Sequence, residues 1–182
     1  MADSHWSGLG AYRAYRRLLR QLPFDLYCIE GPAVQFQTRI GPGDLGDKLE
    51  PQVTGLHTDC TLRKPAARKL WDNGVPNRGY MAYWRNRNTA LPRGLLFMDS
   101  YGWKLQHFLA ESFSELFILH TPYYEPEAVA AFGPDVIISE MAERFVIRPP
   151  VPGSGPPTLA SAREKRADAR YPSHAELAAL PS

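Results

Sequence analysis

The sequence is poor in cysteine, in lysine and in long hydrophobic runs. Only two of its 182 residues are cysteine, which is too few for a disulfide framework or a cysteine-rich zinc site. No run of about 20 apolar residues occurs, so the sequence contains no candidate transmembrane helix. The first ten residues, MADSHWSGLG, have neither a basic region nor an apolar stretch and do not resemble a secretion signal.

Charge gives little indication of a partner. The net charge is +2, which is too small to indicate a nucleic-acid partner by itself. Only five of the 21 basic residues are lysine, and a biased genome composition is the simplest explanation for the arginine excess. The segment 78–93 mixes arginine with aromatic residues, as single-strand binders do, but it stands alone. We therefore predict no nucleic-acid partner.

Length and composition predict one domain followed by a tail. A hydrophobic content of 44% and a charged content of 22% are ordinary for a globular chain. Seven of the 17 prolines lie between Pro149 and Pro181, and the tail opens with the linker-like PPVPGSGPP. We predict a domain over 1–148 and a Pro-rich, mostly disordered tail over 149–182.

The first half of the chain has one clear element. Residues 8–22 have apolar side chains at helical spacing, Ser7 is a plausible N-cap and Pro23 ends the helix. The arginines of this helix are interpreted as a solvated face. An apolar stretch at 24–29 favours a strand. Residues 31–93 are expected to be irregular. Within them we expect short strands near 34–40 and 80–84 and a short helix at 43–49.

The second half has a regular alternation. Short apolar runs, typical of buried strands, alternate with segments of helical spacing. This strand–helix–strand–helix–strand order predicts an α/β fold with a parallel sheet flanked by helices. The expected strands are 94–98, 117–120 and 135–139, and the expected helices are 102–113 and 125–132.

Ser100 is the strongest candidate for a nucleophile. It follows a predicted buried strand and precedes a helix, and ligands of open α/β sheets bind at the carboxyl ends of strands. The backbone N–H groups of Ser100 and Tyr101 could stabilise an oxyanion there. The simpler interpretation is that Asp99 or Ser100 only caps the helix.

A serine nucleophile needs a base, and His5 is the best placed of the five histidines. Asp3 lies two residues before it, so in an extended segment the carboxylate could orient the imidazole. His57 lies near Asp59 and Cys60, but their spacing matches no strong zinc pattern, and we predict no metal. His107 and His120 have ordinary helix and strand-end positions, and His174 falls in the predicted tail.

Four segments together resemble a known family. DSHWSGLGAYRAYRRL, GDLGDKL, LPRGLLFMDSYGWKLQHFL and GPDVIISEMAERFV resemble, in order and spacing, the SGNH-hydrolase-like acetyltransferases of alginate O-acetylation (AlgX- and AlgJ-like). The resemblance covers roughly residues 3–147. It implies an SGNH-hydrolase-like domain of which this chain is the C-terminal portion, lacking the first strands of the sheet.

The resemblance also implies roles for individual residues. Ser100 would be the nucleophile, His5 the general base and Asp3 the residue that orients it. Trp6 belongs to the Asp-x-His-Trp segment, and Arg144 to the Glu-Arg pair. For these two residues, a substrate contact and a structural role both stay open, the latter for Arg144 being an ion pair with Glu143.

The implied function is transfer of an acetyl group to hydroxyls of an exported or cell-envelope polysaccharide through an acetyl-serine. The implied partners are the polysaccharide acceptor and an acetyl donor, supplied by a membrane-bound O-acyltransferase. The implied location is the periplasm or cell envelope, and no cofactor is expected. Two alternatives stay open: a carbohydrate esterase that uses the same triad, and an inactive truncated fragment.

Overall fold

The computed structural model describes residues 3–23, 25–121, 123–145, 151, 155, 157–166 and 168–181. The chain divides into two compact units, an N-terminal unit, Met1–Pro65, and a C-terminal unit, Ala66–Ser182. Each unit has a sheet of its own, with two and five strands. The division between these units falls near residue 65, and the boundary at 148 between domain and tail stays a prediction.

Helix α1 (Gly8–Gln21) begins the N-terminal unit as the sequence predicts. The Ser7 hydroxyl accepts a hydrogen bond from Gly10 N at 3.1 Å, and the helix ends just before Pro23. Ala11, Tyr12, Tyr15 and Leu19 form its buried face. A Cβ at Gly8 would lie 2.6 Å from the backbone nitrogen of Cys60 on strand β2 (Thr54–Leu62), so glycine is required for this close approach.

The strand predicted at 24–29 is wrong for the described residues 25–29. Their backbone bonds to tyrosine hydroxyls of α1 instead of to a neighbouring strand. Tyr12 donates to Ile29 O at 3.0 Å, and Ile29 N donates to the Tyr15 hydroxyl at 2.9 Å. The apolar stretch is thus held against a helix.

Residues 31–93 are more regular than the sequence predicts. Strand β1 (Val34–Pro42) pairs antiparallel with β2 along its whole length, between the 3-10 helices η1 (Gly31–Ala33) and η2 (Gly46–Lys48). The hairpin has exposed apolar residues, with Ile40 and Leu56 both 76% exposed, so it lacks the usual alternation of buried and polar residues. For this reason the sequence does not predict β2. It does not predict β3 (Ala67–Asp72) of the C-terminal unit either, because ARKLWD has no regular alternation of apolar and polar residues.

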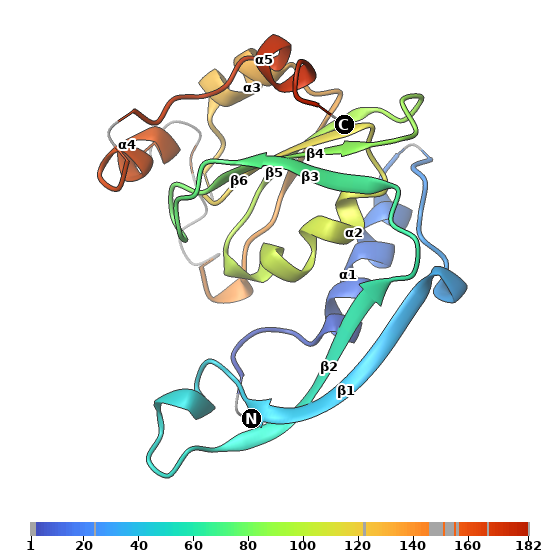
Figure 1. The fold of residues 1–182 in the computed structure, drawn as a ribbon, viewed down its shortest axis with the longest axis vertical. Helices are drawn as coiled ribbons and strands as arrows, with labels where there is room; N and C mark the ends of the chain where they lie inside the picture. The colour runs from blue at the N-terminus through green and yellow to red at the C-terminus, as the bar shows by residue number, and fades with distance from the viewer. Residues whose placement is uncertain are drawn as a thin grey trace. The chain divides into compact units, whose positions relative to one another are not determined.

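The C-terminal unit contains the predicted parallel strands. β5 (Arg93–Phe97) lies between β6 (Glu115–Leu119) and β7 (Val136–Ser139) and is parallel to both. β3 and β4 (Met81–Asn86) extend the sheet beyond β6 as antiparallel strands. The α/β class and the strand–helix–strand–helix–strand order are confirmed, in a sheet that is mixed (Figure 1).

Helices lie on both faces of this sheet (Figure 1). The predicted helix 102–113 is shorter and in two parts, the 3-10 helix η3 (Ser100–Lys104) and α2 (Gln106–Ala110). Helix α3 (Pro126–Phe132) ends at Gly133, whose φ of 64° is a left-handed conformation that suits glycine. Phe132 packs into a core with Phe97 and Phe117.

The prediction of a mostly disordered tail is wrong for its described residues. Helices α4 (Thr158–Arg163) and α5 (His174–Ala178) bury Ala162 and Leu177. The Arg85 guanidinium on β4 donates to the carbonyls of Leu177 and Leu180 at 2.7 and 2.8 Å. Most of the predicted linker PPVPGSGPP lies outside the described residues.

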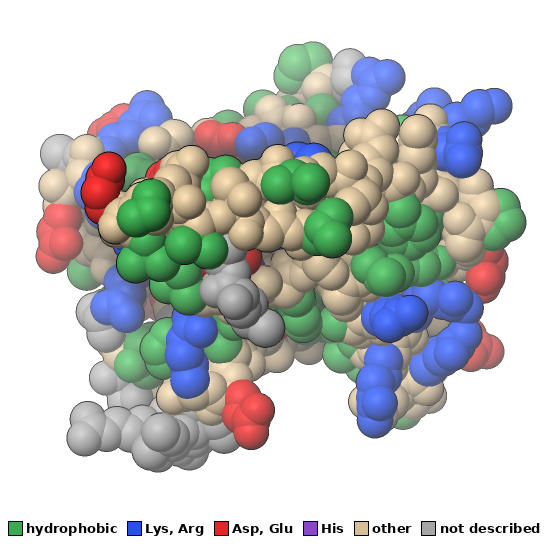
Figure 2. Space-filling model, turned by 90° about the horizontal axis from the view of Figure 1, so that it is seen from below, with side chains coloured by type: hydrophobic (Ala, Val, Ile, Leu, Met, Phe, Trp, Pro, Cys, Tyr) green, Lys and Arg blue, Asp and Glu red, His purple; other side chains and the backbone are tan. Residues whose placement is uncertain are grey.

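Two surface properties accompany this fold. Within the described residues, no helix is both long and apolar enough to cross a membrane. On the face drawn in Figure 2, basic side chains occur in separate groups, with acidic and apolar side chains between them.

Candidate functional site

Ser100 lies where the sequence predicts it, directly after a buried parallel strand. It is the first residue of η3, and two residues separate it from the end of β5. Because β5 has a parallel neighbour on each side, Ser100 lies at the carboxyl edge of the parallel part of the sheet. This edge is where open α/β sheets bind ligands.

Asp99 fixes the turn that carries Ser100. Its carboxylate accepts hydrogen bonds from Tyr101 N and from Ala142 N, both at 2.8 Å. Its side chain is the N-cap of η3, and the whole residue is only 7% exposed. A Cβ at Gly102 would collide with the Met98 side chain, so glycine permits the tight turn. The capping interpretation therefore applies to Asp99, which leaves Ser100 a separate role.

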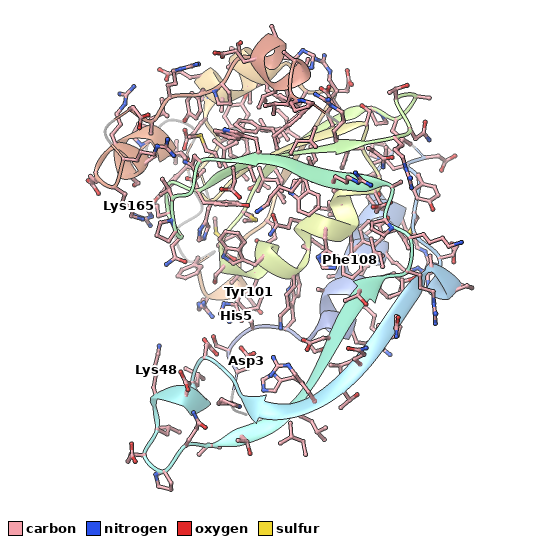
Figure 3. All side chains as sticks on the ribbon, in the orientation of Figure 1. Asp3, His5, Lys48, Tyr101, Phe108 and Lys165 are labelled. Carbon is pink, nitrogen blue, oxygen red and sulfur yellow. The ribbon has the colours of Figure 1, made fainter. Side chains whose placement is uncertain are left out.

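One predicted oxyanion donor does not fit this turn. The Tyr101 N–H is donated to Asp99 Oδ1, so a bound oxyanion would have to displace a carboxylate from it. Tyr101, which lies on η3 and is labelled in Figure 3, is instead a candidate site residue through its aromatic ring. That the Ser100 N–H donates to an oxyanion stays a prediction.

Arg144 contacts this same turn. Its guanidinium lies 5.4 Å from the centre of the Tyr101 ring, and its Nη1 donates to the Tyr101 hydroxyl at 3.4 Å. It also lies 4.8 Å from the ring of Phe145. Arg144 thus contacts aromatic rings beside the turn that carries Ser100, and the ion pair with Glu143 stays a prediction.

Glu140 is a second acidic residue below the turn, and sequence reasoning missed it. It follows β7, and its Oε2 accepts from Asp99 N at 3.2 Å. Burial, followed by the nearby negative charge of Asp99, raises the pKa of Glu140 to about 7. The local signal was an acidic residue, Glu140, directly after the predicted strand 135–139.

Replacing Glu140 with glutamine should change how stability depends on pH. Because the folded-state pKa is raised, the stability that the carboxyl contributes is complete below about pH 4.5 and is lost as the pH rises to about 7. We expect Glu140→Gln to be about 1–3 kcal/mol more stable than the wild type at pH 8, with little difference at pH 4.5. Urea unfolding at both pH values measures this. Glu143→Gln, which changes a nearby exposed carboxyl, is the control. If the free energy of unfolding depends on pH in the same way in the wild type and in Glu140→Gln, the prediction is contradicted.

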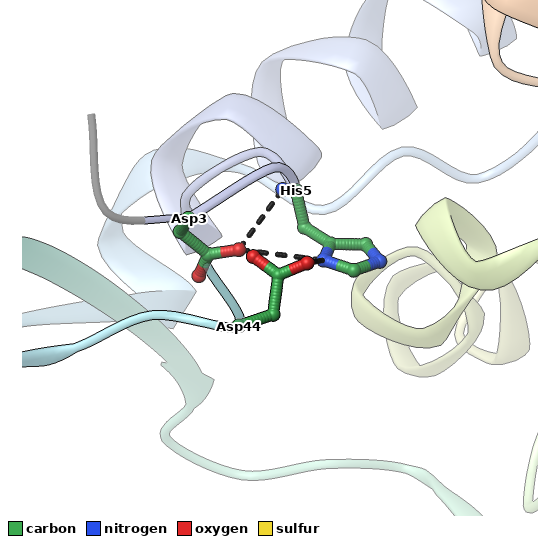
Figure 4. Close-up of side chains that lie close together, drawn as sticks. All are labelled: Asp3, His5 and Asp44. Carbon is green, nitrogen blue, oxygen red and sulfur yellow. Dashed lines mark hydrogen bonds and ion pairs between the residues drawn. The ribbon is translucent and has the colours of Figure 1, made fainter. Parts of the chain in front are cut away.

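The N-terminal unit brings Asp3 and His5 together in the segment before α1 (Figures 3 and 4). Asp3 Oδ1 accepts from His5 N at 2.9 Å and lies 3.3 Å from His5 Nδ1. The contact that the Asp-x-His spacing predicts is therefore present. Trp6 follows as a half-buried residue just ahead of the helix, and its role stays open.

Two residues that the sequence did not assign to this cluster belong to it. Asp44, in the loop before η2, lies with Oδ2 3.5 Å from His5 Nδ1. His57 is buried behind Asp3, with Nδ1 3.6 Å from Asp3 Oδ2 and Nε2 2.9 Å from Gly41 O. No local spacing links these residues to His5, because the β1–β2 hairpin brings them there.

The metal interpretation of His57 with Asp59 and Cys60 finds no support. Asp59 is paired with Arg39 at 2.8 Å, and burial raises the pKa of the Cys60 thiol to about 11. Among the described residues, the group whose ligand atoms come within 4.8 Å of one another is Asp3, His5 and Asp44. It offers one histidine and two carboxylates, a set that could hold a cation.

The remaining histidines have structural surroundings. The His107 ring lies 4.0 Å from that of Phe108, and burial lowers the pKa of His120 at the end of β6. His174 is not in a disordered tail: it begins α5, and its Nε2 lies 2.6 Å from Glu115 Oε2. The contact of His5 with Asp3 matches the pair that the sequence predicts, and its role stays a prediction.

Comparisons with known proteins show the fold. No protein-family description and no curated protein matches the chain. Among solved structures, a DHHW family protein from Eubacterium siraeum is similar over 81% of this chain and 59% of its own, with 15% identity and a TM-score of 0.59. PatB1 from Bacillus cereus is similar over 80% of this chain and 62% of its own, again with 15% identity and a TM-score of 0.59. A structure of PatB1 with a sulfonyl adduct has a TM-score of 0.58. The chain thus shares its fold with proteins of which it spans about 60% of the length.

Proposed function

We propose that this chain carries the catalytic residues of a serine-dependent O-acetyltransferase that acts on hydroxyls of an exported or cell-envelope polysaccharide. The observation that carries the proposal is the position of Ser100, on an Asp99-capped turn at the carboxyl end of a central parallel strand. The Asp3–His5 contact supports the proposal that these two residues are the other members of a triad. The likeness to PatB1, at 15% identity, supports a polysaccharide O-acetyltransferase-like function.

The proposed reaction has two half-reactions. In the first, His5 Nε2 takes the proton of the Ser100 hydroxyl while Oγ attacks the acetyl carbonyl, and the donor leaves with that proton. In the second, an acceptor hydroxyl loses its proton to His5 and attacks the acetyl-serine, and Ser100 leaves as the hydroxyl. Asp3 holds the Nδ1 side of the ring throughout.

The three residues of the proposed triad come from different units of the chain. Asp3 and His5 come from the N-terminal unit and Ser100 from the C-terminal unit, so catalysis requires that the units bring them within hydrogen-bond reach. The acetyl donor, a membrane-bound O-acyltransferase that supplies it, and a location in the periplasm or cell envelope belong to the same proposal. They rest on the family resemblance of the four sequence segments.

Acetylation of the protein by p-nitrophenyl acetate tests the proposal. We expect one acetyl group per chain, which peptide mass mapping should place on Ser100. Ser139, an exposed serine at the end of the neighbouring strand, is the internal control and should stay unmodified. A folded protein that forms no acetyl-serine at Ser100 would overturn the proposal.

Adding an oligosaccharide acceptor then separates transfer from hydrolysis. Both share the acetyl-serine, and they differ only in whether a sugar hydroxyl or water attacks it. A transferase should lose the acetyl group faster with the acceptor present and should yield acetylated sugar. Free acetate alone, at a rate independent of the acceptor, would indicate a carbohydrate esterase.

A further inference from the structure

We propose that Asp44 is a positioning residue for the general base, because it binds the residue between Asp3 and His5 and presents a second carboxylate to the His5 imidazole. The inference rests on the proposed function, in which His5 is that base. It adds a residue about forty positions away from the Asp-x-His segment.

The closest contacts of Asp44 are with Ser4. Oδ1 accepts from Ser4 N at 2.6 Å, and Oδ2 accepts from the Ser4 hydroxyl. Ser4 is the central residue of Asp3-Ser4-His5, and two hydrogen bonds to one residue restrict its backbone and its side chain together. A loop of the β1–β2 hairpin thereby fixes the directions in which the side chains of Asp3 and His5 project from the backbone.

The same carboxylate also faces the imidazole. Asp44 Oδ2 lies 3.5 Å from His5 Nδ1, and Asp3 Oδ1 lies 3.3 Å from the same atom. In Figure 4 both carboxylates point at Nδ1, and the other ring nitrogen, Nε2, points away from them. Two acceptors on Nδ1 favour the tautomer with its proton there, which makes Nε2 the nitrogen that accepts a proton.

Asp44 is suited to this role because both of its carboxylate oxygens accept hydrogen bonds from Ser4. The hydrogen bonds from the Ser4 hydroxyl and the Ser4 backbone hold the pKa of Asp44 well below its usual range. The other titratable groups of the cluster are Asp3 and, behind it, the buried His57. The imidazole of His5 thus has two carboxylates on one side, of which only Asp3 belongs to its own segment.

Three variants test the role of Asp44. Asp44→Ala removes both the Ser4 contacts and the charge. Asp44→Asn keeps an oxygen that can accept from Ser4 N, but it replaces the charge with a neutral amide. Asp47→Ala is the matched control. Asp47 lies three residues after Asp44, is exposed, and accepts a hydrogen bond from Gln52 and not from Ser4.

The first measurement does not depend on activity. Nitrogen NMR of the His5 side chain reports which ring nitrogen carries the proton. We expect the Nδ1–H tautomer to predominate in the wild type and in Asp47→Ala, and to lose population in both Asp44 variants. A tautomer unchanged in Asp44→Asn would overturn the inference, because a purely structural role needs only the Ser4 contact. If Asp44→Ala does not fold, the tautomer measured in Asp44→Asn still tests the inference.

The second measurement is the rate of Ser100 acetylation. We expect a loss of about 10- to 100-fold in the Asp44 variants and none in Asp47→Ala, since small misplacements of a catalytic group have effects of this size. Wild-type rates in both Asp44 variants would contradict the inference. Absence of acetylation in the wild type itself would refute the proposed function, whereas the tautomer measurement would still show whether Asp44 positions His5.

Discussion

Replacing Ser100 with alanine should abolish formation of the acetyl-enzyme, and replacing His5 with alanine should slow it by about 10²- to 10⁴-fold. Ser100→Ala removes the attacking oxygen itself. His5→Ala leaves the hydroxyl in place but removes the group that takes its proton, and a serine hydroxyl is a weak nucleophile without a base. Release of p-nitrophenol, followed with acetylation of the protein by intact mass, measures both effects.

The control for these variants is another histidine in a structural setting. His107→Ala changes a ring that packs on Phe108, and it should leave the acetylation rate of Ser100 within a few-fold of the wild type. Melting curves establish that each variant is folded. A His5→Ala protein that acetylates Ser100 at the wild-type rate would remove His5 from the mechanism and leave Ser100 as an isolated reactive hydroxyl.

Replacing Asp99 with alanine should have the largest effect on the stability of the candidate site. The Asp99 carboxylate is buried and accepts from both Tyr101 N and Ala142 N, so its loss leaves two backbone donors without their acceptor. We expect a loss of about 2–4 kcal/mol, from the unsatisfied donors and the missing N-cap together. Urea unfolding gives the free energy.

Asp99→Asn distinguishes the hydrogen bond that caps η3, from Tyr101 N, from the hydrogen bond donated by Ala142 N. The asparagine oxygen can still accept from Tyr101 N, but its amide would face the N–H of Ala142, so we expect a loss intermediate between the wild type and Asp99→Ala. In both variants acetylation of Ser100 should fall, because the turn that presents the hydroxyl is no longer fixed. Unchanged stability in Asp99→Ala would mean that water replaces the carboxylate at no cost.

Local signals were sufficient to predict the elements that present Ser100. A short apolar run followed by Asp-Ser predicts a buried strand and a capped turn, and β5 and η3 confirm that arrangement. The same holds for α1, where Ser7 and Pro23 mark both ends within the sequence itself. In each case the stabilising contacts lie within a few residues of one another, so spacing alone reveals them.

The features that the sequence did not reveal depend on contacts between distant residues. Asp44 reaches Ser4 across 40 positions and Glu140 reaches Asp99 across 41, so no spacing rule connects them. The tail shows the same limit in its energetics. Its composition indicates disorder, but Arg85 and Glu125 bind its backbone from outside it, at Leu177 and Thr158. The composition of the tail does not include these two partners, because they lie outside it.

The central claim is that Asp3 and His5 of one unit act on Ser100 of the other, and a crystal structure of the acetylated protein tests it most directly. The account predicts His5 Nε2 within about 2.6–3.2 Å of the Ser100 oxygen, or linked to it by one water, with Asp3 on Nδ1. A structure with both units folded, Ser100 acetylated and His5 beyond the reach of a bridging water would contradict it.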